Sequence, residues 1–224
     1  MKIVSILGSP HGGSGNTARL LGLVLDAAEK HGAKTEIVYV PGHNVLPCKG
    51  CDFCHKRGKC IQKDEFEAIK EKIKKADGLI LASPNYIFSV SAQIKAFMDR
   101  CCGIVHCMEF EGKYGASVIT SGGGDEAPIA EYLDRFMIAT GIRPIGSVWA
   151  TMAMITGDTF PLEIEEKARL LGETLVKSWE CRDTKPEVEK ALSQFKDRMR
   201  NLVLNMKDEW TFEYDYWVKN HDLQ

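Results

Sequence analysis

The stretch Lys2-Ile-Val-Ser-Ile-Leu7, followed directly by Gly8-Ser-Pro-His-Gly-Gly-Ser-Gly-Asn-Thr17, decides the fold. Its first part is a short β-branched and apolar run, which is typical of a buried strand. Its second part is rich in turn-forming residues, and a helical pattern follows over residues 17–30. A strand, a glycine-rich loop and a helix in this order indicate the beginning of a parallel α/β sheet.

The same alternation continues along the chain. Four more strands are predicted at residues 36–40, 78–82, 114–120 and 146–150, and helices at 64–75, 92–102 and 127–140. Five strands separated by helices predict an α/β fold with a doubly wound five-stranded parallel sheet.

The alternation of strands and helices ends near Pro161. We assign residues 1–160 to the sheet domain, including a four-cysteine loop at 48–60, and residues 161–224 to a helical C-terminal extension. Two long amphipathic helices are predicted there, followed by an aromatic and acidic end. We expect the extension to pack on the same domain and to contribute to an oligomer interface, because its apolar surface would be poorly covered on a monomer.

Composition excludes several classes of protein. The 224 residues are 44% hydrophobic and carry a net charge of −2, which gives no general attraction to nucleic acid. The apolar run at the amino terminus is too short for a signal peptide, and no stretch approaches the roughly 20 apolar residues of a membrane span. We expect a cytoplasmic protein without nucleic-acid or membrane partners, in which thiols stay reduced.

Four cysteines, Cys48, Cys51, Cys54 and Cys60, lie in one loop. Thiolates are the ligands that iron–sulfur clusters and zinc select, and four of them so close in sequence can converge on one centre. The C-x2-C-x2-C part is similar to the start of a bacterial ferredoxin run, although the fourth cysteine follows after five residues. One four-cysteine cluster is the simplest interpretation; a structural zinc ion or an empty site is the alternative.

Other cysteines and histidines lack such spacing. Cys101, Cys102 and Cys107 lie on or just beyond a predicted buried helix and are interpreted as small core residues. His55 and His106 have no partner pattern and are interpreted as surface or packing residues.

Three loops are predicted at the carboxyl edge of the sheet, where doubly wound folds bind ligands. Loop 8–17 combines glycines and hydroxyls with a helix amino terminus, a combination suited to a phosphate. It lacks the Gly-Lys-Ser/Thr of a nucleoside triphosphate loop and matches a dinucleotide fingerprint only loosely. Loop 83–92 offers an aromatic wall, and loop 120–124 allows close backbone approach. A flat, phosphorylated, redox-active ring fits this combination.

These loops carry a family resemblance. Gly8-Ser-Pro with Gly15-Asn-Thr17, Ser83-Pro-Asn-Tyr86 with Gln93-Ile-Lys95 and Asp99-Arg100, and Thr120-Ser-Gly-Gly-Gly124 resemble the NAD(P)H-dependent FMN reductase branch of flavodoxin-like proteins. With the cysteine loop added, the chain resembles the iron–sulfur flavoproteins of anaerobic microbes. The resemblance implies flavodoxin topology with strand order 2-1-3-4-5, FMN on the three loops and a [4Fe–4S] cluster on the four cysteines. It also implies homodimers or homotetramers in which the cluster and flavin of neighbouring subunits exchange electrons.

On this resemblance, every expected FMN contact lies in one of the three loops. The residues are Ser9, His11, Ser14, Gly15, Asn16, Thr17, Pro84, Asn85, Tyr86, Ile87, Phe88, Ser89, Thr120, Ser121, Gly122, Gly123 and Gly124. No side chain is expected to act as a catalytic acid or base, because the chemistry is centred on the flavin.

The function expected from these features is an FMN-dependent oxidoreductase that passes electrons between a one-electron carrier such as ferredoxin and a second acceptor. A cluster handles one electron at a time and a flavin one or two, so the pair converts between carriers. One alternative is an NAD(P)H-dependent reductase of FMN, quinones or small molecules in which the cysteine loop is secondary. Another is a non-enzymatic redox sensor or a zinc-stabilised flavin-binding module.

Overall fold

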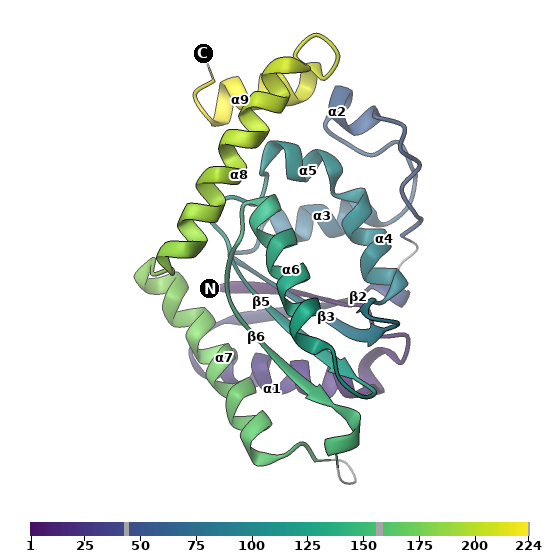
Figure 1. The fold of residues 1–224 in the computed structure, drawn as a ribbon, viewed down its shortest axis with the longest axis vertical. Helices are drawn as coiled ribbons and strands as arrows, with labels where there is room; N and C mark the ends of the chain where they lie inside the picture. Colours follow the sequence, from purple (N-terminus) through teal and green to yellow (C-terminus); the bar gives the residue numbers. More distant parts are fainter. Residues whose placement is uncertain (43–44, 156–158, 224) are drawn as a thin grey trace.

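A computed structural model describes residues 1–42, 45–155 and 159–223, and Figure 1 shows its fold. Five parallel strands form a sheet in the order β2-β1-β3-β5-β6. Their bounds are β1 Lys2–Leu7, β2 Lys34–Tyr39, β3 Gly78–Tyr86, β5 Tyr114–Ser121 and β6 Arg143–Thr151. The predicted five-stranded sheet and its 2-1-3-4-5 order are confirmed. The short strand β4, Ser89–Val90, pairs antiparallel with the end of β3 and was not predicted.

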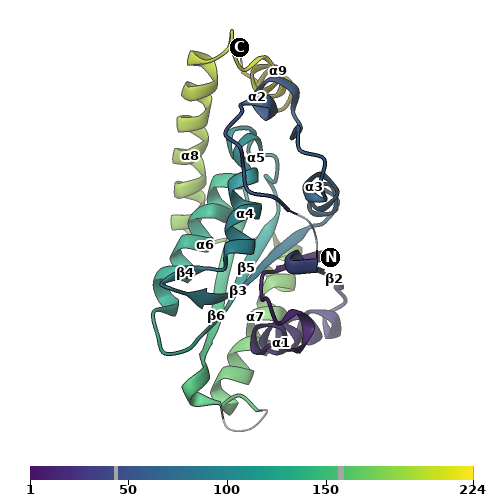
Figure 2. The same ribbon diagram turned by 90° about the vertical axis from the view of Figure 1, so that its right-hand side faces the viewer.

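Helices cover both faces of the sheet, as the edge-on view in Figure 2 shows. Helices α1, Asn16–Lys30, and α7, Leu162–Cys181, bury apolar side chains against one face. Helices α3, Phe66–Lys74, α4, Ala92–Arg100, and α6, Glu126–Thr140, form a second core with the other face. Packing on both faces explains why the central strands β1, β3 and β5 are almost entirely buried.

Helix α7 packs closely on α1. A Cβ atom at Gly172 would lie 2.1 Å from the carbonyl oxygen of Val24, so only glycine allows this approach. The first helix of the C-terminal extension therefore shares a core with the first helix of the chain.

The C-terminal helices and the cysteine loop lie at the end of the molecule opposite the carboxyl end of β6 (Figure 1). Helix α8, Pro186–Asn205, runs from α7 towards this end, where α2, Phe53–Arg57, α5, Cys102–Cys107, and α9, Thr211–Asn220, gather. Three short 3₁₀ turns lie at Gly12–Ser14, Val40–Gly42 and Met152–Met154.

Helix α9 contains the aromatic, acidic segment, to which no secondary structure was assigned from the sequence. Its Trp217 is only 1% exposed, and the indole Nε1 donates a hydrogen bond of 2.9 Å to the carbonyl oxygen of His106. The segment is thus anchored on its own subunit. None of the helices in the described part of the chain has the length and apolar character needed to cross a membrane.

Candidate functional site

The three predicted loops meet at the carboxyl edge of the sheet. Because β1, β3 and β5 are parallel neighbours, the segments that follow them leave the sheet side by side. The hydroxyls of Thr17 and Thr120 lie 2.6 Å apart and share a buried hydrogen bond, which joins the first loop to the third. The side-chain amide of Asn85 donates a 2.9 Å hydrogen bond to the carbonyl oxygen of Gly124, which joins the second loop to the third.

The first loop folds tightly around the start of α1. A Cβ at Gly15 would lie 2.9 Å from the Cβ of His11 and 3.0 Å from the buried hydroxyl of Ser9, so the loop closes on itself here. Helix α1 begins at Asn16 without a side-chain hydrogen bond to its first turn. Its first N–H groups and the positive end of its dipole are therefore not satisfied by a capping side chain.

Two polar side chains of this loop have local partners. The hydroxyl of Ser14 donates to the carbonyl oxygen of His11 at 2.9 Å, and both residues are exposed. The amide of Asn16 lies 2.7 Å from the sulfur of Met152, next to the end of β6. The loop is thus held in shape while its outer surface stays open.

The second loop is a hairpin. Strand β3 continues past residue 82 to Tyr86, and β4 returns antiparallel to it from Ser89. The two turn residues, Ile87 and Phe88, have φ angles of 49° and 62°, a left-handed conformation that these residue types rarely adopt. They are 89% and 77% exposed. The hairpin therefore presents two apolar side chains to solvent from a strained turn.

Asn85, at the base of this hairpin, uses only part of the hydrogen-bonding capacity of its side-chain amide. Its Nδ2 group holds the third loop, while its Oδ1 atom is shielded from solvent and has no hydrogen-bond partner among the described residues. A buried acceptor without a donor is costly unless a ligand or water supplies one.

Glu126 shapes the third loop and was not predicted from the sequence. Its buried carboxylate accepts hydrogen bonds from the hydroxyls of Ser121 and Thr151, and the Ser121 hydroxyl in turn accepts from the N–H of Gly124 at 3.0 Å. Burial raises the pKa of Glu126, but the two hydroxyls outweigh it and hold the pKa below its usual value. This network leaves Gly122 and Gly123 exposed at the edge.

The four predicted ligand cysteines line one cavity of about 60 Å³. Cys48 and Cys51 are exposed, Cys54 and Cys60 are half-buried, and all four are free thiols. The turns that bring them together lie at the left-handed residues Gly50, Asp52 and Gly58. The structure therefore gathers the predicted set around one space.

Arg100, at the end of α4, holds the two ends of this cysteine loop together. Its fully buried guanidinium makes a bidentate pair with Asp64 at 2.7 and 3.0 Å and donates to the carbonyl oxygen of Leu46 at 2.9 Å. Burial lowers the pKa of Arg100, but Asp64 and Cys60 raise it above its usual value overall. Its Nε atom is buried and has no hydrogen-bond partner in the part of the chain that the structure describes, and the residue lines the cysteine cavity. A fixed positive charge thus lies beside the thiols.

The structure corrects the sequence interpretation of three residues. Cys101 and Cys107 are buried as expected, but Cys102 lies between two histidines: its sulfur is 3.8 Å from His55 Nε2 and 3.9 Å from His106 Nε2. These histidines are therefore not isolated packing residues. The interpretation failed because the residues come from α2 and α5, which only the fold brings together.

Glu213 of α9 completes this cluster. Its fully buried carboxylate accepts from His55 Nδ1 at 2.5 Å and from His106 Nδ1 at 3.0 Å. Burial lowers the pKa of both histidines, but hydrogen bonds to Cys102 and Glu213 raise it by more, and for His55 a hydrogen bond to Cys54 adds to this effect. The pKa of His55 therefore rises to about 12 and that of His106 to about 9. Hydrogen bonds from His106 and His55 lower the pKa of Cys102 to about 6.

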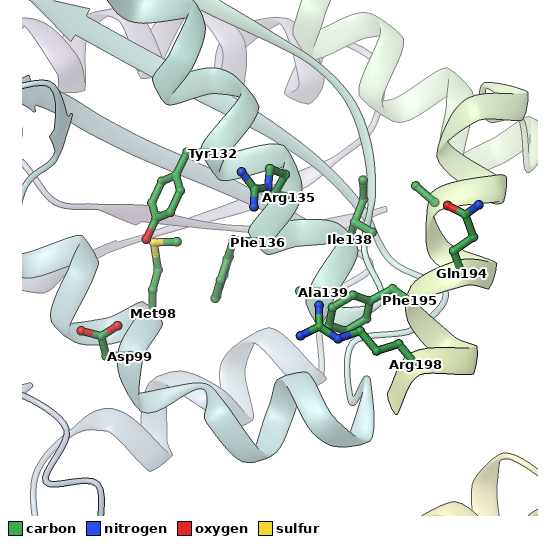
Figure 3. A pocket seen from close by; sticks show the side chains of 11 residues that line it. Met98, Asp99, Tyr132, Arg135, Phe136, Ile138, Ala139, Gln194, Phe195 and Arg198 are labelled. Carbon is green, nitrogen blue, oxygen red and sulfur yellow. The ribbon is translucent and has the colours of Figure 1, made fainter. Parts of the chain in front are cut away.

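A larger cavity, about 630 Å³, lies elsewhere, between α4, α6 and α8 (Figure 3). Apolar side chains such as Phe136 and Phe195 line it together with Arg135 and Arg198. None of the predicted flavin or metal residues faces it. Its size alone does not make it the site of redox chemistry.

Comparison with known proteins agrees with this geometry. The family described as NADPH-dependent FMN reductase matches residues 1–156. A protein named iron-sulfur flavoprotein from Archaeoglobus fulgidus is 31% identical over 218 residues, covering 97% of each chain. Among solved structures, RosB with a bound 8-demethyl-8-formylriboflavin-5'-phosphate superposes with a TM-score of 0.65 at 16% identity, covering 88% of this chain and 87% of that one. A flavodoxin from the domain Archaea has a TM-score of 0.53 at 14% identity, covering 80% and 99%.

Proposed function

The chain belongs to the NADPH-dependent FMN reductase family, as an FMN-dependent oxidoreductase related to the iron–sulfur flavoproteins, and we propose that it passes electrons through FMN and a [4Fe–4S] cluster. The observation that carries the proposal is the gathering of two separate sets of residues. Three loops meet at the carboxyl edge of the sheet, and four cysteines line one cavity beyond α4.

The residues at the sheet edge fit FMN. The uncapped start of α1 and the hydroxyls around it would bind the phosphate, since N–H donors and a positive dipole end favour an anion. The partnerless Oδ1 of Asn85 offers an acceptor for an N–H group of the ring system, and the hairpin residues Tyr86 to Phe88 supply apolar surface. The exposed glycines of the third loop leave room for the ring to approach the backbone.

The residues of the cysteine loop fit a cluster better than a single zinc ion. A tetrahedral zinc ion with Zn–S distances of about 2.3 Å would hold its thiolates about 3.8 Å apart. Among the described residues, the ligand atoms of His55, Cys102 and His106 lie within 4.8 Å of one another, whereas those of no three of the four cysteines do. The wider spacing supports a polynuclear centre, and the adjacent Arg100 would offset part of its negative charge.

Helix α4 connects the two sites. It begins just after the hairpin and ends at Arg100 beside the cysteines, a length of about 13 Å at 1.5 Å per residue. When bound, the cluster would supply single electrons and the flavin one- or two-electron chemistry. The protein's own groups bind, orient and shield these cofactors, and we propose no side chain as a catalytic acid or base.

We further propose a homodimer or homotetramer in which the hairpin and the C-terminal extension, residues 161–224, contribute contacts. The two exposed apolar residues of the hairpin support this proposal, since such side chains gain from burial against another surface. Light scattering on the full chain tests it, because a monomer at all accessible concentrations would contradict it.

Replacement of Thr17 by glutamate tests the phosphate site. A negative charge at the start of α1 should repel the phosphate and weaken FMN binding strongly, whereas Thr211→Glu, the same change in the first turn of α9, should leave FMN affinity unchanged. Because Thr17 is buried, Ser14→Glu at an exposed position of the same loop is a second variant. Wild-type FMN affinity in both variants would reject this site.

Iron analysis tests the cluster. Cys54→Ala should abolish or cripple the cluster in anaerobically purified protein while FMN stays bound, and Cys181→Ala, at an exposed free thiol of α7, should retain full iron. Full iron in the Cys54 variant, or zinc in its place in the wild type, would reject the proposal. Stopped-flow reduction by reduced ferredoxin and by NAD(P)H then separates the electron-transfer function from the reductase alternative.

A further inference from the structure

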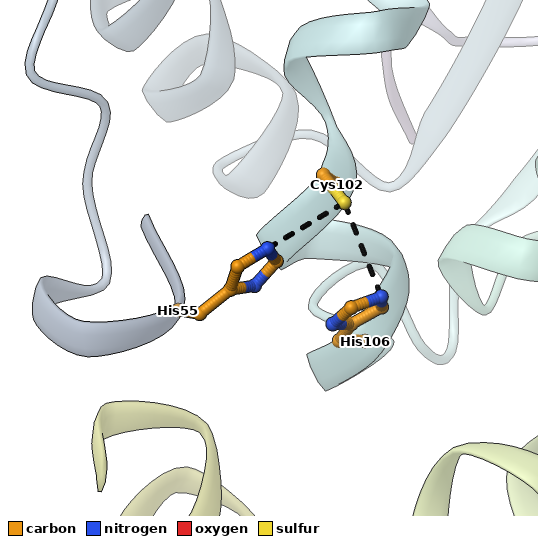
Figure 4. Close-up of side chains that lie close together, drawn as sticks. All are labelled: His55, Cys102 and His106. Atoms are coloured by element: carbon orange, nitrogen blue, oxygen red, sulfur yellow. Dashed lines mark hydrogen bonds between the residues drawn. The ribbon is translucent and has the colours of Figure 1, made fainter. Parts of the chain in front are cut away.

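A second ligand set borders the cysteine cavity, which His55 and Cys102 also line, and it has no role in the proposed electron path. It consists of His55 from α2 and of Cys102 and His106 from α5, with Glu213 and Trp210 packed behind them from the last segment of the chain. Figure 4 shows both histidine rings turned towards the sulfur of Cys102. Cys54 contacts His55, but neither the flavin loops nor the four-cysteine set explains why His106 and Glu213 converge with it on Cys102.

The spacing of the three ligand atoms matches a single metal ion. The Cys102 sulfur is 3.8 Å from one Nε2 and 3.9 Å from the other, and all three atoms lie within 4.8 Å of one another. With a Zn–S distance of about 2.3 Å and Zn–N distances of about 2.0–2.1 Å, a tetrahedral ion would place sulfur and nitrogen about 3.6 Å apart. The two sulfur–nitrogen distances therefore need to shorten by only a few tenths of an ångström to match such an ion.

Glu213 orients both histidines as a metal ion would require, and the ion would replace the hydrogens that the protonated rings carry on their Nε2 atoms. Each of its carboxylate oxygens accepts a hydrogen bond from one Nδ1 atom, so the Nδ1 atoms carry hydrogen and the Nε2 atoms face Cys102. A carboxylate behind a ligating histidine is the usual arrangement of metal sites, where it orients the ring and raises its basicity. Here one fully buried carboxylate does this for two rings.

Trp210 limits the movement of the rings. Its indole stacks on His55 at 4.6 Å and on His106 at 4.9 Å between ring centroids, and the two imidazoles stack on each other at 4.7 Å. The ligand set is therefore preorganised, which reduces the entropy lost when an ion binds.

We propose that His55, Cys102 and His106 bind a zinc ion, with water or Asp52 in the fourth position. Two imidazoles and one thiolate are ligands that zinc prefers. The carboxylate of Asp52 lies 3.8 Å from His55 Nε2 and is mostly exposed, so it can turn towards the ion from the solvent side. The ion would tie α2, which carries the cluster ligand Cys54, to α5.

Zinc and iron analysis of the same anaerobically purified, iron-loaded protein tests the proposal. After incubation with zinc chloride and desalting, the wild type should retain one zinc ion per chain. Cys102→Ser should lose the zinc and keep its iron, whereas Cys181→Ser should keep both metals. Glu213→Gln should weaken zinc binding by about 10- to 100-fold, because it disturbs the orientation of the rings and not a ligand.

X-ray absorption at the zinc edge identifies the ligands. The expected first shell holds one sulfur at about 2.3 Å and nitrogen or oxygen neighbours at about 2.0–2.1 Å. A shell of four sulfurs would place the zinc on the cysteine loop and overturn the proposal. So would a wild type that retains no zinc, zinc that Cys102→Ser retains, or a Cys102→Ser protein that loses iron together with zinc.

Discussion

Replacement of the hairpin turn Ile87-Phe88 by Asn-Gly should make the protein more stable and its flavin binding weaker. Both turn residues have left-handed φ angles, 49° and 62°, which Asn and Gly adopt readily and a β-branched Ile does not. The native side chains are 89% and 77% exposed, so removing them forfeits little buried apolar area within the subunit. Strain relief should therefore dominate the change in stability.

The magnitude follows from the backbone conformation. Each left-handed residue of ordinary type costs about 1–2 kcal/mol, whereas the extra freedom of the new glycine in the unfolded chain costs about 0.5–1 kcal/mol. Because Asn at the first position keeps part of the left-handed cost, we expect a net gain of about 1–2 kcal/mol. For a chain of this size that corresponds to a rise in Tm of about 3–6 °C, measured on flavin-free protein.

A matched variant separates strain from side-chain contacts. Ile87→Ala with Phe88→Ala removes the same apolar groups but keeps the left-handed turn, so its Tm should stay near that of the wild type. Both double variants should bind FMN about 10-fold more weakly, the effect of losing about 1.4 kcal/mol of contact with the ring. A Tm for the Asn-Gly protein at or below the wild-type value would refute the argument from strain.

Three further predictions concern the scaffold. Burial raises the pKa of Asp134 to about 6, so the native state loses stability as pH rises from about 4 to about 6. In urea denaturation, Asp134→Asn should therefore be more stable than wild type by about 1–3 kcal/mol at pH 7.5 and equally stable below about pH 4. Gly172→Ala should destabilise by about 2 kcal/mol or more, because the new Cβ would overlap the backbone of Val24; an unchanged urea midpoint would contradict the close packing of α1 and α7. Asp64→Asn should cost about 3–5 kcal/mol, since it leaves the buried charge of Arg100 without an ionised partner, and its iron content should fall as the cysteine loop loosens; a fully iron-loaded, equally stable variant would contradict this role.

Much of the sheet domain could be predicted because its signals are local. Strands β1 and β3 contain short apolar runs, and the order of the five strands follows from the family resemblance carried by the loops. Strand β4 was missed because a two-residue strand after Ile87-Phe88 has no periodicity, and its turn residues are not those that usually signal a hairpin. Helix α9 was missed since its aromatic residues face several sides and give no clear apolar stripe.

The two groups of cysteines also differ in whether their signal is local in the sequence. Cys48 to Cys60 could be recognised as one ligand set because a single loop holds all four, and the structure gathers them around one cavity. The second site could not be predicted in this way. Cys102 lies 47 positions from His55, and His55 lies 158 positions from Glu213. Only packing of α9 against α2 and α5 creates that site.

If Glu213 orients both histidines, the aromatic end of the chain has a second role besides covering apolar surface: it shapes the metal-binding chemistry next to the proposed cluster. The segment would then be under functional constraint even though it lies outside the residues that the family match covers.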